Sequence, residues 1–146
     1  MSAELNAVTV FCEDMRAEAS GSETLVGIWP DNLNLPAFPF TIPKLCIYTR
    51  IAVGIDYPHR NLSVTMTTPD RQEHALGTID AALFTKSLED ARFHGAPMTT
   101  IIMRAVASPF NVLKPGRVEI YVKAHRKKVL TASLNIGLAP SEPNAS

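Results

Sequence analysis

The chain has 146 residues, a length that allows one domain rather than two because domains average roughly 100–200 residues. Its 46% hydrophobic and 19% charged residues are typical of globular proteins and exclude disorder along the whole chain. Fourteen basic and fourteen acidic residues cancel, which removes the electrostatic basis for general binding to nucleic acid or to an acidic membrane. We therefore predict a protein partner or a homo-oligomer, with no nucleic-acid and no membrane partner.

The first residues lack the basic start and apolar run of a secretory signal, and no stretch approaches 18 consecutive apolar residues. We therefore expect a protein that is cytoplasmic when synthesised. Cys12 and Cys46 are too few for a disulfide-dense scaffold, and each lies in an apolar strand-like run, so two buried free thiols are predicted. A Cys12–Cys46 disulfide would require these strands to adjoin, which their spacing does not determine.

The first third of the chain predicts a hairpin followed by an extended connector. Residues 7–15 alternate with the period of a strand, residues 16–23 are polar, and residues 24–29 are apolar again, which indicates two strands and a turn. Four prolines, at positions 30, 36, 39 and 43, follow within one short segment. Because proline removes a backbone donor, this segment is predicted to be a connector or an edge rather than a central strand.

Alternation over residues 45–55 is the strongest strand signal, and the turn Asp56-Tyr57-Pro58-His59 leads into a second alternating run over 62–67. The two runs are predicted to pair as a longer hairpin. A weaker strand is expected over 73–79. One short helix is expected over 80–94, where Asp80 can cap the start and four apolar residues have helical spacing, namely Leu83, Phe84, Leu88 and Ala91.

The last third predicts three more strands. Residues 99–110 are β-branched and apolar, and Pro109 is expected to end or bulge this strand. Residues 118–124 and 130–136 alternate on either side of Arg126-Lys127-Lys128, which indicates a closing hairpin. The polar residues 139–146 form a tail that is not expected to pack.

These elements favour an all-β fold. Many short strands, each with one apolar face, fit an antiparallel two-sheet β-sandwich, Ig-like or C2-like, with at most one short helix near 80–94. The domain is predicted to span residues 1–138. A closed barrel is the main alternative, whereas a parallel α/β sheet is disfavoured because the crossover helices are missing.

No common enzyme signature is present, because the sequence lacks a phosphate loop, a nucleophile elbow, a paired-histidine zinc motif and a paired-cysteine knuckle. Four histidines, at 59, 74, 94 and 125, have no metal-ligand spacing. Asp90 and His94, four residues apart, are more consistent with support of a short helix than with acid–base chemistry. We predict no catalytic residue, no metal and no cofactor.

Two segments are candidate binding surfaces. The first is the apolar part of the proline-rich segment, which either covers one end of the core or forms a partner-binding edge: Leu33, Leu35, Phe38, Phe40 and Ile42. The second is a basic turn that either contacts phosphate or prevents edge-to-edge aggregation: His125, Arg126, Lys127 and Lys128. Acidic residues gather near the N-terminus, at 13, 14, 18 and 23, so a head-to-tail contact between copies is a further option.

Three strings resemble a family of small uncharacterised bacterial and phage proteins: Val10-Phe11-Cys12-Glu13-Asp14-Met15-Arg16, Leu25-Val26-Gly27-Ile28-Trp29 and Phe40-Thr41-Ile42-Pro43-Lys44-Leu45. The likeness covers mainly residues 8–55. It implies no activity and no site residue, but it favours a virion component or a host-interaction protein.

The leading functional hypothesis is a non-enzymatic protein-interaction or assembly module, which would be virion-associated if the protein is of phage origin. The alternative is a β-sandwich that binds a small ligand or a carbohydrate with its end loops. A pocket with converging polar groups would favour the ligand binder, and a flat apolar edge near 33–42 would favour the interaction module.

Overall fold

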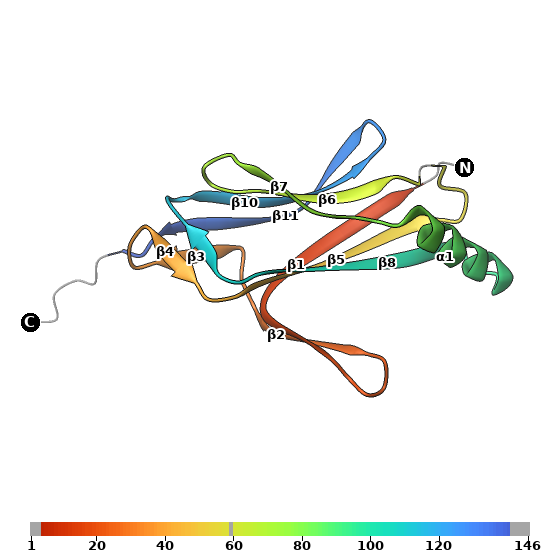
Figure 1. Ribbon diagram of the computed structural model, residues 1–146, viewed down its shortest axis with the longest axis horizontal. Helices are drawn as coiled ribbons and strands as arrows, with labels where there is room; N and C mark the ends of the chain where they lie inside the picture. The colour runs from red at the N-terminus through yellow and green to blue at the C-terminus, as the bar shows by residue number, and fades with distance from the viewer. Residues whose placement is uncertain (1–3, 59, 141–146) are drawn as a thin grey trace, which may run out of the picture.

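The computed structural model describes residues 4–58 and 60–140. Two sheets face each other (Figure 1), one with strand order β2-β1-β5-β8 and one with order β3-β11-β10-β6-β7, and β4 pairs with β9 in a small third sheet. The elements are β1 (Leu5–Ala17), β2 (Glu23–Ile28), β3 (Asn32–Leu35), β4 (Phe40–Ile42), β5 (Leu45–Gly54), β6 (Leu62–Thr67), β7 (Glu73–Thr78), α1 (Ala81–Phe93), β8 (Met98–Ala107), β9 (Phe110–Val112), β10 (Gly116–Ala124) and β11 (Lys127–Leu138).

The core lies between the two large sheets. Alternate residues of the central strands point inward and are almost fully buried, for example Ile47 and Ile51 of β5 and Val118 and Ile120 of β10. The predicted two-sheet β-sandwich is therefore confirmed, and its strands are antiparallel except for one parallel pair, β3 with β11.

Hydroxyl groups also link the two sheets. Thr131 of β11 donates to the Ile120 carbonyl oxygen at 3.1 Å, so its oxygen accepts from Thr9 of β1 at 2.7 Å. Thr9 in turn accepts from Thr49 of β5 at 2.8 Å. Because each hydroxyl carries one proton, these bonds form a single directed chain from Thr49 through Thr9 and Thr131 to Ile120.

The predicted hairpin of residues 45–55 with 62–67 is wrong. β5 pairs with β1 and β8, whereas β6 pairs with β10 and β7 in the other sheet. The connection carries a buried Tyr57 and crosses between the sheets; His59, at the end of the predicted turn, lies outside the described residues. Alternation identifies a strand but not its partner, so a connection between sheets looks like a hairpin turn in the sequence.

The predicted helix is confirmed as α1. The Asp80 side chain accepts bonds from the backbone N–H groups of Ala82 and Leu83, which caps the first turn. Phe84, Leu88 and Ala91 are buried, but Leu83 is 61% exposed and does not share their face. The His94 ring bonds to the Asp90 carbonyl oxygen rather than to its carboxylate, which supports the end of the helix.

The proline-rich segment is an edge, as predicted. β3 is the outermost strand of its sheet, and β4 pairs only with β9. β8 ends at Ala107, just before Ser108-Pro109, and the chain resumes as β9. The segment therefore forms one end of the sandwich, on the left in Figure 1.

The closing hairpin of β10 and β11 is confirmed, but its turn is shorter than predicted. Ala124 pairs with Lys127, so only His125 and Arg126 form the turn, and Lys127 and Lys128 belong to β11. His125 has a φ of 55°, a positive value that two-residue hairpin turns require. Of the predicted tail, residues 141–146 lie outside the described residues, while the Ala139 N–H donates to the Leu35 carbonyl oxygen.

Candidate interaction surfaces

The apolar candidates of residues 33–42 divide into two groups. Leu35 and Ile42 are only 4% and 3% exposed and belong to the core. Leu33, Phe38 and Phe40 are partly buried and pack against that core. The candidates for partner binding in this segment are therefore reduced to these three side chains.

Two exposed leucines flank the three side chains. Leu138 is 59% exposed and lies opposite Leu35 at the end of the β3–β11 pair. Leu113 is 61% exposed and follows Val112, the β9 residue opposite Phe40. We refer to these five residues as the apolar end: Leu33, Phe38, Phe40, Leu113 and Leu138.

A cleft of about 430 Å³ adjoins the apolar end, between β9 and the β6–β7 turn. Apolar walls come from residues such as Phe110 and Leu113. The polar lining consists of Thr68, Asp70, Gln72, His74 and Asn111. The Thr68 hydroxyl donates to the Asp70 carboxylate and holds the pKa of that group below its usual value, so the cleft contains an ionised acceptor near neutral pH.

The basic turn lies at the far end of the β10–β11 hairpin from the apolar end, since Ala124 pairs with Lys127 there whereas Gly116 pairs with Ile136. All four side chains of the basic turn are exposed. Lys128 Nζ lies 4.1 Å from the Tyr121 ring centroid, and the neighbouring Lys123 forms an ion pair with Glu73. The structure therefore does not bring the two predicted surfaces together.

Replacing Arg126, Lys127 and Lys128 together by serine should leave the fold nearly unchanged. Exposed charges contribute little to stability, so we expect the free energy of unfolding to change by less than about 1 kcal/mol. Urea denaturation measures this change in the free energy of unfolding. The exclusion of nucleic acid would be wrong if the wild type bound single-stranded DNA or RNA, salt weakened this binding, and the triple variant no longer bound.

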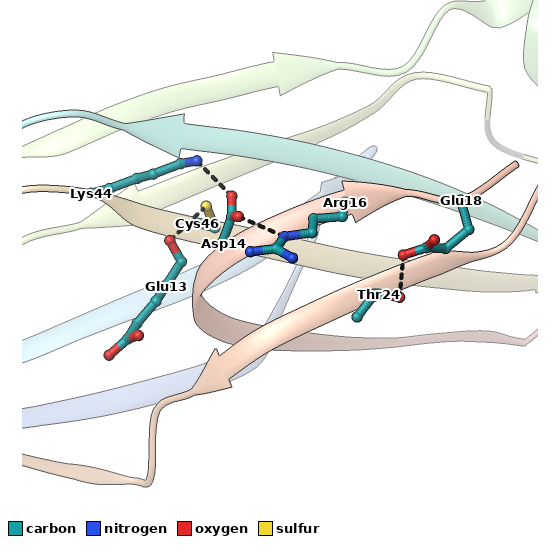
Figure 2. Close-up of polar contacts among 7 residues, drawn as sticks. All are labelled: Glu13, Asp14, Arg16, Glu18, Thr24, Lys44 and Cys46. Atoms are coloured by element: carbon teal, nitrogen blue, oxygen red, sulfur yellow. Dashed lines mark hydrogen bonds and ion pairs between the residues drawn. The ribbon is translucent and has the colours of Figure 1, made fainter.

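Three of the four acidic N-terminal residues, Asp14, Glu18 and Glu23, bond to other side chains of the chain. Figure 2 shows the Asp14 carboxylate between Lys44 and Arg16, with N–O distances of 2.7 Å and 3.2 Å. The hydrogen bond from Lys44, followed by that from Arg16, lowers the pKa of Asp14 to about 2. Glu23 forms an ion pair with Arg104 of β8, and Glu18 accepts from Thr24. Asp14 and Glu23 are thus neutralised within the chain, whereas Glu13 and Glu18 remain exposed.

The β1–β2 hairpin is an arm, which we define as residues 13–28. β1 pairs with β5 only up to Cys12 and then continues with β2 alone. Figure 1 shows β1 bending at this point and the turn of the hairpin pointing away from both sheets. Sequence reasoning found the hairpin but not its side-chain contact with β8, because Glu23 and Arg104 are 81 positions apart.

Both cysteines are free and fully buried at the base of this arm. They occupy directly opposite positions on the paired strands β1 and β5. The Cys46 thiol donates to the Glu13 carbonyl oxygen at 3.7 Å. Burial, and secondarily the adjacent Cys46 thiol, raises the pKa of Cys12 to about 11. The strands that carry Cys12 and Cys46 therefore do adjoin, which is the condition for a disulfide between them.

Within residues 4–58 and 60–140, no group of three or more His, Cys, Asp or Glu side chains is arranged to hold a metal ion. No helix in the same part of the chain is long and apolar enough to cross a membrane. His59, one of the four histidines considered from the sequence, lies outside these residues.

These features define an all-β sandwich with a projecting hairpin arm and an apolar end. The chain belongs to DUF6941, a family of unknown function whose model matches residues 7–137. The expected likeness to an uncharacterised family is thus confirmed. Neither a curated protein nor a solved structure matches the chain.

Proposed function

We propose that the protein is a non-enzymatic interaction or assembly module that binds a protein partner or a second copy of itself through the apolar end. The observation that carries the proposal is the gathering of two partly exposed phenylalanines and two exposed leucines at one end of the sandwich. Aromatic side chains are enriched in the buried centres of protein interfaces. The phage resemblance extends the proposal to a virion component or a host-interaction protein.

Proline supports this surface for a physical reason. An exposed strand edge risks indiscriminate pairing, and Pro36 and Pro39 remove backbone donors between the short strands β3 and β4. The side chains remain available to a complementary pocket, whereas strand pairing cannot continue through the segment between β3 and β4. Such an edge favours one defined partner.

Replacing Phe38 by aspartate should disrupt assembly more than stability. A buried charge at an interface centre should weaken binding by more than about tenfold, while the melting temperature changes by about 5 °C or less. Size-exclusion chromatography with light scattering measures self-association, pull-down from the source cells measures partner binding, and thermal unfolding measures stability.

Leu130→Asp is the matched control, because Leu130 is 49% exposed on β11 near the basic turn, away from the apolar end. It should preserve both assembly and stability. If Phe38→Asp unfolds the isolated monomer, the ring is part of the core and the interface proposal fails. The interface proposal also fails if Phe38→Asp and Leu130→Asp both assemble like the wild type.

The cleft beside β9 favours a second function, the binding of a small ligand or carbohydrate by the end loops. Its volume of about 430 Å³ lies in the range of ligand sites, and apolar walls with a few polar groups are typical of such sites. Calorimetric titration with mono- and oligosaccharides tests this function. Saturable binding that Asp70→Asn abolishes would favour it over the interaction module.

A further inference from the structure

Cys12 and Cys46 form a cross-strand pair at the base of the arm. The antiparallel register places them opposite each other, where Cα atoms of paired residues are about 4.5–5.5 Å apart. A disulfide needs Cα atoms roughly 4.4–6.8 Å apart, so both types of opposite position in an antiparallel pair satisfy this requirement. Both thiols are 0% exposed.

The pair is isolated from other thiols. The sequence has only these two cysteines, so oxidation within one chain has a single outcome. The cysteines occupy the last position at which β1 pairs with β5, and the arm begins at the next residue. A covalent bond at this point would fix the base of the arm to the sheet.

We propose that Cys12 and Cys46 are a redox site that closes to an intramolecular disulfide when a low-molecular-weight disulfide, such as oxidised glutathione, reaches the base of the arm. One thiolate attacks the glutathione disulfide, forms a mixed disulfide and releases one glutathione thiolate. The second protein thiolate then attacks the protein sulfur of the mixed disulfide, and the second glutathione leaves. Two protein thiols are oxidised and one glutathione disulfide is reduced to two thiols.

The arm controls the rate of this reaction. Burial keeps both thiols out of solvent and raises the pKa of Cys12, and only thiolates attack disulfides. Two charged contacts hold the arm beside the sheet: Asp14 with Lys44 next to Cys46 (Figure 2), and Glu23 with Arg104 of β8. Movement of the arm away from β8 exposes the pair, so oxidation reports how often the arm opens.

The test is to incubate the folded, reduced protein with oxidised glutathione at about pH 8 and to follow its intact mass after acid quenching. We expect a monomer that has lost the mass of two hydrogen atoms and no longer reacts with iodoacetamide after denaturation. Peptide mapping should join the peptides that contain Cys12 and Cys46. Single Cys12→Ser and Cys46→Ser variants are controls, because neither can form this product.

The oxidised protein should also unfold at a higher temperature, by roughly 5–15 °C, because the bond closes a long loop in the unfolded chain. Adding dithiothreitol should reverse both the mass change and this shift.

Arm variants test the control of the rate. Glu23→Gln removes the ion pair with Arg104 and should accelerate closure by about two- to fivefold. Glu18→Gln is the matched control, since the Glu18 carboxylate accepts from Thr24 within the arm, and its rate should equal that of the wild type.

Three results would overturn the proposal. One is that the thiols of the wild type and of Glu23→Gln both stay reduced while the proteins remain folded. Oxidation could stop at the mixed disulfide, or it could give covalent dimers instead of the closed monomer. Equal rates for Glu23→Gln and Glu18→Gln would refute the role of the arm.

Discussion

Replacing Phe84 by alanine should lower the free energy of unfolding by about 3–5 kcal/mol, the range for deleting a buried aromatic ring. The Phe84 ring is fully buried on the inner face of α1, and the Arg60 guanidinium lies 5.3 Å from its centroid. Alanine would leave a cavity under the helix and would remove the ring on which Arg60 stacks. Equilibrium unfolding in urea, followed by circular dichroism, measures the change.

Leu83→Ala is a control within the same helical turn. Leu83 is 61% exposed, so its truncation should change the free energy of unfolding by about 0.5 kcal/mol or less. If the two variants lose equal stability, the assignment of the inner face of α1 is wrong.

Replacing Thr9 by valine should cost about 2–3 kcal/mol, because it removes the middle member of the hydroxyl chain between the sheets. Thr49 is 1% exposed and would lose its acceptor without gaining water. Thr131 would lose its donor. Urea denaturation again gives the free energy of unfolding.

The double variant Thr9→Val with Thr49→Val separates the bond from the loss of individual hydroxyls. Removing both partners leaves no orphaned Thr49 hydroxyl, so the double variant should lose less stability than the sum of the two single variants. Strict additivity would mean that Thr9 and Thr49 do not interact.

The sequence predicted the strands but not which of them pair. Alternation in residues 45–55 identified β5 because one side of this strand is buried along its whole length. That signal is local, whereas the partners of β5 are β1 and β8, which come from distant parts of the chain. The wrong prediction of a β5–β6 hairpin arose because a local signal does not identify a distant partner strand. The adjacency of Cys12 and Cys46 was undetermined for the same reason.

The candidate surfaces were predicted in part. Proline marked residues 33–42 as an edge, but hydrophobicity alone did not distinguish the buried Ile42 from the partly exposed Phe40. Leu113 and Leu138 were not predicted as part of the apolar end. Only the pairing of β4 with β9 and of β3 with β11 brings them to that end. The length of the basic turn was overestimated, since charge patterning does not define where pairing stops.

The parallel pairing of β3 with β11 has a consequence for synthesis of the protein on the ribosome. Asn32 and Asn135, which bond across this pair, are 103 positions apart, so β3 emerges long before its partner strand exists. Contacts so distant in sequence form late in folding. Leu33 and the phenylalanines that follow it therefore remain uncovered while most of the chain is translated, which makes this segment the expected binding site for a chaperone that acts on nascent chains.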